Sequence, residues 1–268
     1  MNKEFLKIYI KKLKYFRYSE HTITSYTHYV MKFLEKTGKY HQHITAGDFQ
    51  NYLDSFKFTS ISQQNQVISA IKFLYEKVLN KKYAKIDFTR PRKEFRQPKI
   101  IDYNMVSAKI GKIKNLKHKA ILAIPFTTGL RVSEVLNLRI KDIDSNRMII
   151  NVYQGKGKKD RIVPLSIELL ALLRNYFKQF KPKEYLFNGQ FRNKYSPASC
   201  NSIIKKYIEK AATMHILRHT YLTYLADHNI ALKTIQDIAG HKNSKTTEIY
   251  IHLSTATLKT VPTPSLSA

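Results

Sequence analysis

The sequence holds one cysteine among its 268 residues, Cys200. A disulfide needs two cysteines, and a structural zinc site built on cysteine needs at least as many. Both are therefore excluded within a single chain. We interpret Cys200 as a small buried hydrophobic residue rather than as a reactive thiol.

Long apolar runs are also missing. The longest candidate, residues 120–125, is followed by Thr127, Thr128 and Gly129. It falls well short of the roughly 20 apolar residues that a helix needs to cross a bilayer. Residues 1–5 lack the extended apolar core of a secretory signal peptide. We therefore expect a cytoplasmic protein with no membrane partner.

Acidic side chains are scarce beside basic ones. Lysine and arginine total 47 against 19 aspartates and glutamates, a formal net charge of +28. Such a chain repels itself unless a polyanion is nearby; nucleic acid is the commonest, and an anionic membrane surface is the rival. The excess is spread over both halves of the sequence, so we expect both halves to face the same polyanion. A generally basic proteome is the alternative explanation.

Helical periodicity runs through residues 1–88. Apolar side chains recur at helical spacing in four segments. Ser19 and Gly38 are typical caps of the second helix, and Thr45 with Asp48 resembles a capping box that opens the third. Ser62 is the expected start of the fourth. Four short amphipathic helices predict one small bundle.

The pattern breaks at residues 89–100. This segment holds Pro91, Pro98 and five basic side chains, and it shows no periodicity. Proline removes helix donors and stiffens the chain, which predicts a linker between two domains. Its charge suggests that the linker lies along a phosphate backbone, with a solvated loop as the alternative.

Residues 101–268 predict a second, mixed domain. Residues 148–153 and 161–165 have the composition of strands, and the glycine- and lysine-rich segment between them predicts a hairpin. We therefore expect a mainly α protein with a small β-sheet, in which a four-helix bundle precedes an α+β domain. The helices of that domain are expected at 117–128, 132–138, 167–179, 199–209, 215–227, 232–239 and 245–250.

Three segments of this second domain stand out, and each has a structural interpretation when taken alone. Arg131 and Glu134 have the spacing of a helical ion pair. His215 and His219 lie four apart, which also suits a metal, although no glutamate follows His215 as in a zinc-protease motif. Tyr250 is one of 18 tyrosines. The three segments are Thr128–Glu134, His215–Thr220 and Gly240–Tyr250.

Cleaving a DNA phosphodiester without a metal ion calls for a particular set of side chains. Arginine suits the phosphate oxygens because its guanidinium is planar, always charged and bidentate. Tyrosine suits the nucleophile because its phenolate is later a good leaving group, which keeps the link reversible. Histidine and lysine supply proton transfer and further charge stabilisation. The three segments, with the lysine hairpin, hold this set in one domain.

The order of these residues resembles the catalytic set of the tyrosine recombinases, a family that includes Xer proteins, phage integrases and integrases of mobile elements. Thr-Gly-Leu-Arg-Val-Ser-Glu is similar to the family's first arginine motif, and Gly155 to Leu165 is similar to its lysine hairpin. His-x-Leu-Arg-His-Thr and Gly-His-Lys-x-Ser-x-Thr-Thr-x-x-Tyr resemble its last two motifs. The resemblance covers nearly the whole chain. The residues that carry it are Arg131, Lys156, His215, Arg218, His241 and Tyr250.

The resemblance implies a role for each residue. Arg131 and Arg218 are expected to clamp the scissile phosphate, and Tyr250 to form a 3′-phosphotyrosyl link. Lys156 is expected to reach the leaving 5′-hydroxyl, although Lys158 and Lys159 are close enough in sequence to replace it.

The remaining side chains of the motifs are expected in supporting roles. His215 is implied as the general base or an acid–base partner, and His241 as a hydrogen-bond partner of the phosphate. Glu134 is expected to orient the site, and His219 to be structural. One departure concerns residues 211–214, where family members often have a longer loop; a displacement of His215 by this shortening would change its role.

The resemblance also implies architecture and partners. Residues 1–88 are expected to form a SAM-like core-binding domain, 89–100 a basic linker, and 101–268 the catalytic domain with a C-terminal tail. Double-stranded DNA is the implied substrate, with no cofactor and no metal. A homo-oligomer is implied, with a dimer on each site and a tetramer in the synapse. Integration, excision, inversion and resolution stay open as outcomes, and a type IB topoisomerase or a catalytically inactive DNA-binding module are the alternatives.

Overall fold

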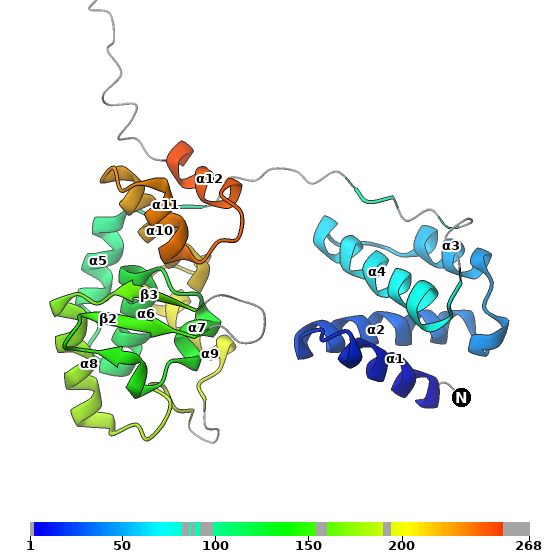
Figure 1. Ribbon diagram of the computed structural model, residues 1–268, viewed down its shortest axis with the longest axis horizontal. Coiled ribbons are helices and arrows are strands. Elements are labelled where there is room, and N and C mark those ends of the chain that lie inside the picture. The colour runs from blue at the N-terminus through cyan, green and yellow to red at the C-terminus, as the bar shows by residue number, and fades with distance from the viewer. Residues whose placement is uncertain are drawn as a thin grey trace, which may run out of the picture. The chain divides into compact units, whose positions relative to one another are not determined.

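The computed structural model describes residues 3–81, 86, 89–91, 99–153, 160–189 and 194–253. The chain divides into two compact units, Met1–Phe95 and Arg96–Ala268, and each has a hydrophobic core of its own (Figure 1). Within the described residues, no helix is both long and apolar enough to span a membrane. Cys200 is buried as expected, and burial raises the pKa of its thiol to about 11.

The first unit is a helical bundle whose caps follow the sequence. Ser19 accepts a hydrogen bond from the backbone of Thr22, and Gly38 ends the second helix with a left-handed φ of 64°. The capping box of Thr45 and Asp48 is confirmed. The helices are α1 (Lys3–Tyr15), α2 (Glu20–Thr37), α3 (Ala46–Ser55) and α4 (Ile61–Phe73), with a 3₁₀ turn at His41–His43 and a π-helical turn at Leu74–Val78 after α4.

The expected start of the fourth helix was wrong by two residues. Ser60, in extended conformation, accepts a hydrogen bond from the backbone of Gln63 and caps α4. Ser62 lies inside the first turn. Serine is favoured at the N-cap because its hydroxyl satisfies an otherwise unpaired N–H, and either serine satisfies that rule in the sequence.

The second unit combines helices with a small antiparallel sheet, which confirms the expected fold class. The strands lie in the order β1–β2–β3, with Ile150 of β2 facing Ile143 of β1 and Val163 of β3. Helix α6 packs against α8 and α10, and α10 in turn packs against α11 and α12, which Figure 1 shows together at one end of this unit. The elements are α5 (Tyr103–Gly111), α6 (Leu116–Thr128), α7 (Val132–Asn137), a 3₁₀ turn (Ile140–Asp142), β1 (Ile143–Asp144), β2 (Ile149–Val152), β3 (Arg161–Pro164), α8 (Ile167–Phe180), α9 (Pro197–Tyr207), α10 (Met214–Asp227), α11 (Leu232–Ala239) and α12 (Lys245–Leu253).

Three elements of this unit were not predicted: α5, the 3₁₀ turn at Ile140–Asp142, and β1. Most of the linker, 92–98, and the hairpin turn, 154–159, lie outside the described residues. The antiparallel pairing of β2 with β3 is observed, whereas the turn that joins them stays a prediction.

Gly129 joins α6 to the segment that carries the first arginine. It ends α6 with a φ of 69°, in the left-handed region that glycine tolerates best. A Cβ at this position would lie 3.0 Å from Cδ1 of Tyr221 on α10. Both the backbone and the packing therefore require glycine, and this close approach brings Arg131 toward the residues of α10.

Candidate active site

The second unit brings together five of the six predicted site residues. Arg131 precedes α7, and His215 and Arg218 lie on α10. His241 follows α11, and Tyr250 lies on α12. The sixth, Lys156, lies outside the described residues, as do its alternatives Lys158 and Lys159.

Arg218 is the most deeply buried cation of the site, with 1% of its surface exposed. Its Nη1 donates to the carbonyl of Gly129, and its Nη2 donates to the carbonyl of Ala239 at 2.7 Å. Burial and the nearby charge of Arg131 lower the pKa of Arg218 to about 10, so it stays cationic at neutral pH. The ends of α6 and α11 thus hold this guanidinium, where helix carbonyls carry partial negative charge.

Arg131 is held against the same helix end but is more open to solvent. Its Nη2 donates to the carbonyl of Gly240 at 3.2 Å, and its side chain is 31% exposed. The carbonyl of Ile238 accepts from Nε of Arg161 at 2.8 Å. Three consecutive carbonyls at the end of α11, those of residues 238, 239 and 240, therefore bind three different arginines.

Glu134 links two of these arginines. Its Oε1 accepts from Nη1 of Arg131 at 3.0 Å, and both of its oxygens accept from Arg161 at 3.0 and 2.8 Å. Burial raises the pKa of Glu134, but hydrogen bonds and charge from the two arginines outweigh it and hold the pKa below its ordinary value. Glu134 thus contacts both arginines at once, which is compatible with the orienting role that the sequence predicts. The participation of Arg161 was missed, because its sequence context indicated only a strand.

His241 contacts Arg218 rather than open solvent. Its Nε2 lies 2.9 Å from Nη2 of Arg218, and its Nδ1 lies 2.9 Å from the hydroxyl of Thr247. Burial and the two site arginines lower the pKa of His241 to about 3, so the ring is neutral. Because arginine only donates, Nε2 accepts here and the ring proton lies on Nδ1. In this state His241 supports Arg218.

Tyr250 is buried within the same group, with 2% of its surface exposed. Its hydroxyl lies 2.7 Å from Nδ1 of His219, and its ring is nearly parallel to that of His241. Burial raises the pKa of Tyr250, while Arg218 and Arg131 oppose that rise. The contact with His219 was not predicted from the sequence, where that histidine was expected to be structural.

His215 lies in the first turn of α10, shortly after the N-cap Thr213. Its ring makes an edge contact with that of His219, with centroids 4.2 Å apart. The surrounding protein, Arg218 and Arg131 lower the pKa of His215. The short segment before it therefore leaves His215 on α10, beside the other site residues. Among the described residues, no group of three or more histidine, cysteine or acidic side chains is arranged to hold a metal ion.

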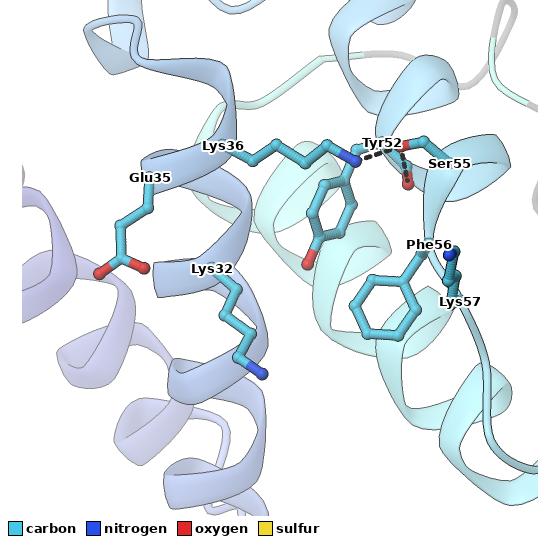
Figure 2. A pocket seen from close by; sticks show the side chains of 7 residues that line it. All are labelled: Lys32, Glu35, Lys36, Tyr52, Ser55, Phe56 and Lys57. Carbon is cyan, nitrogen blue, oxygen red and sulfur yellow. Dashed lines mark hydrogen bonds between the residues drawn. The ribbon is translucent and has the colours of Figure 1, made fainter.

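The first unit carries a separate basic pocket between α2 and α3, with a volume of about 490 Å³. Its lining has three lysines against one glutamate, and its residues are Lys32, Glu35, Lys36, Tyr52, Ser55, Phe56 and Lys57 (Figure 2). Nζ of Lys36 reaches across to the hydroxyl of Ser55 at 2.6 Å. Cations beside aromatic rings suit the phosphates and bases of nucleic acid.

Comparison with known proteins covers both units. Residues 100–257 match the phage integrase family, and residues 5–85 match the N-terminal SAM-like domain of phage integrases. The tyrosine recombinase XerA of Pyrococcus horikoshii is 34% identical over 251 residues, which cover 90% of this chain and 86% of the relative. A putative integrase/recombinase of Sinorhizobium fredii, y4qK, is 33% identical over 248 residues, covering 89% of this chain and 80% of the relative.

Solved structures agree with these matches. The crystal structure of a XerA recombinase superposes with a TM-score of 0.56 at 30% identity, covering 97% of this chain and 96% of that one. A XerH site-specific recombinase bound to difH substrate has a TM-score of 0.70 at 20% identity and covers 88% and 77%, which shows the shared fold. With its motifs, its fold and its relatives in agreement, the chain belongs to the phage integrase family as a tyrosine recombinase.

Proposed function

We propose that this recombinase cleaves and rejoins double-stranded DNA at specific sites, through a 3′-phosphotyrosyl link to Tyr250. The observation that supports the proposal is the contact of Arg218 with His241, whose ring lies parallel to that of Tyr250. Arg218 and Arg131 bind the adjacent carbonyls of Ala239 and Gly240, so their two positive charges lie close together and repel one another. An anion bound by both relieves that repulsion, and a phosphate diester is the anion that a tyrosine hydroxyl can attack.

Arg131 and Arg218 are proposed to bind the non-bridging oxygens of the scissile phosphate. Arg131 is the more exposed of the two and meets the phosphate first. Arg218 has a buried Nε without a hydrogen-bond partner in the described part of the chain. Leaving such a donor unpaired costs about 1–3 kcal/mol, which a phosphate oxygen can recover. Two fixed guanidinium groups then supply the charge stabilisation for which other nucleases use metal ions, so we propose that no metal or other cofactor is needed.

The proton-transfer roles follow the family resemblance. Lys156 is proposed to protonate the leaving 5′-oxygen, with Lys158 and Lys159 as alternatives. His215 is proposed as an acid–base partner within the site. His241 is proposed to donate a hydrogen bond to the phosphate through Nε2. That bond requires the contact with Arg218 to open and the ring proton to move to Nε2, because Nε2 now accepts from Arg218.

The two units are proposed to divide the binding of DNA. We assign residues 1–88 to core binding, 89–100 to a basic linker along the backbone, and 101–268 to catalysis. Solved relatives with the same fold include a XerH recombinase bound to difH substrate and a Tn1549 transposon integrase in complex with transposon right end DNA. We propose a dimer on each site and a tetramer in the synapse, acting on DNA in the cytoplasm.

The test uses a nicked duplex that carries the cognate site, taken from DNA flanking the gene. The protein is incubated with it in chelator and without magnesium, and covalent protein–DNA adduct is measured after denaturation. Wild type is expected to form adduct, and Tyr250→Phe to form none. Tyr207→Phe is the matched control, because its hydroxyl also contacts a histidine ring nitrogen, Nδ1 of His118 at 3.2 Å.

Each other outcome has a clear meaning. Adduct in Tyr250→Phe would assign the nucleophile to another residue. Tight binding of the site without adduct in wild type would favour a DNA-binding module that lacks catalysis. Relaxation of supercoiled plasmid that lacks the site would favour a type IB topoisomerase.

A further inference from the structure

The hydroxyl of Tyr250, the proposed nucleophile, contacts a ring nitrogen of His219. The hydroxyl lies 2.7 Å from Nδ1 of His219, a short distance for a hydrogen bond between oxygen and nitrogen. The two residues come from α12 and α10, so the contact depends on tertiary packing. His215 meets the ring of His219, and His219 in turn meets the hydroxyl.

The protonation states of the two groups allow the tyrosine to donate in this hydrogen bond. Burial, His215 and Arg218 lower the pKa of His219 to about 4, so its ring is neutral at neutral pH. Burial raises the pKa of Tyr250, so its hydroxyl keeps its proton. A neutral imidazole has one acceptor nitrogen. We assign Nδ1 as that acceptor, so that the tyrosine donates to His219 and the ring proton lies on Nε2.

We propose that His219 takes the proton of Tyr250 as the hydroxyl attacks the scissile phosphate. The inference rests on the proposed function, because it assigns a further catalytic residue to that reaction. The Oη–H bond breaks and the proton moves to Nδ1, while Oη forms a bond to phosphorus. The bond from phosphorus to the 5′-oxygen breaks, and that oxygen takes a proton from the lysine assigned above. In rejoining, the imidazolium returns its proton to Oη as the 5′-hydroxyl attacks.

DNA binding makes His219 a better acceptor. Arg218 and His215 face it from α10, Tyr250 from α12, and His241 from the segment after α11. In the free protein the cationic arginine weakens the basicity of the ring. A phosphate bound by the arginines adds negative charge that offsets this effect, because charges interact strongly in a buried site. His219 therefore becomes basic when the substrate is in place.

The test compares His219→Asn with wild type. The amide oxygen of asparagine can occupy the position of Nδ1 and accept the hydrogen bond, but it cannot take the proton. Adduct formation on the nicked duplex is expected to slow by about 100-fold or more, the usual contribution of a general base. His118→Asn is the matched control, since Nδ1 of His118 also contacts a tyrosine hydroxyl, that of Tyr207, and the adduct rate of this variant is expected to stay near that of wild type.

A second substrate tests whether His219 acts as the base on Tyr250 or as the acid that protonates the leaving group. Sulfur in place of the 5′-bridging oxygen leaves without needing a proton, so it restores variants of the residue that protonates the leaving group. It is not expected to restore His219→Asn. Restoration by sulfur, or a wild-type rate with the ordinary substrate, would overturn the proposal.

Imidazole supplies an independent measurement if asparagine disturbs folding. His219→Ala leaves space for a free imidazole, and its adduct rate is expected to rise with imidazole concentration. An adduct rate that does not change with imidazole concentration would assign His219 a structural role only. Absence of adduct from wild type would instead count against the proposed function and not against this residue.

Discussion

Glu134 and Arg161 form a bidentate ion pair next to Arg131, with both carboxylate oxygens within 3.0 Å of the guanidinium nitrogens. Both side chains are more than nine-tenths buried. Arg161 also holds the carbonyl of Ile238. The pair thus ties β3 to the start of α7 and to the end of α11.

Removal of the carboxylate charge is expected to destabilise the protein strongly. Glu134→Gln leaves Arg161 as a buried cation without its anion, which costs about 3–5 kcal/mol in the free energy of unfolding. Urea denaturation measures this change. Glu184→Gln is the control, because its ion pair with Arg139 is exposed and is expected to contribute at most about 1 kcal/mol. Equal effects of the two substitutions would contradict the interpretation.

Stability is expected to fall as the pH drops from about 6.5 toward 4. The pKa of His219 is about 4 in the folded protein against an ordinary value of 6.5. Across this window the unfolded chain binds a proton at this residue that the folded chain does not, so acid favours unfolding. Unfolding free energies of wild type and His219→Asn, measured across the window, check this. The variant is expected to show the shallower slope, and parallel curves would assign the acid sensitivity to other groups.

Gly129→Ala is expected to lower stability by about 1–3 kcal/mol, because it combines a left-handed backbone with a tight contact on Tyr221. The same change is expected to slow adduct formation, since the carbonyl of Gly129 holds Arg218. Gly111→Ala is the control: a Cβ there meets no atom within 4 Å. Its thermal midpoint is expected to stay at or above that of wild type.

The pocket of the first unit is expected to contribute to the salt dependence of DNA binding. A double substitution, Lys32→Gln with Lys57→Gln, is expected to reduce the slope of log affinity against log salt by about 2, roughly one unit for each phosphate that the protein no longer neutralises. Lys7→Gln with Lys11→Gln on α1 removes the same charge. Titration of the labelled site at several salt concentrations gives both slopes. Equal reductions would mean that overall charge, and not the pocket, drives binding.

Local signals in the sequence were enough for much of the fold. Ser19, Gly38 and the Thr45–Asp48 pair act on their own helix ends, so neighbouring residues are sufficient to predict them. The strand β1 has two residues and exists through its pairing with β2, which leaves almost no local pattern. The helix start at Ser60 was missed because two serines satisfy the same capping rule.

In the candidate site, too, residues within local motifs were predicted, and contacts between distant elements were not. Residues with distinctive motifs, such as Arg131 and Tyr250, were predicted, and the structure brings them together. The contact of Arg161 with the carbonyl of Ile238 and that of His219 with the hydroxyl of Tyr250 were not predicted, because each joins residues on two different elements. Such contacts depend on how β3, α10, α11 and α12 pack, and no spacing within one segment encodes them.

The last turn of α11 has a consequence for how the site responds to perturbation. Its carbonyls at 238, 239 and 240 accept from Arg161, Arg218 and Arg131 in turn. A slip of this short helix by one residue would misplace all three guanidinium groups at once. The cationic centre is therefore expected to be either fully assembled or fully dismantled, so that anything pulling on α11 acts as an on–off control and not as a graded one.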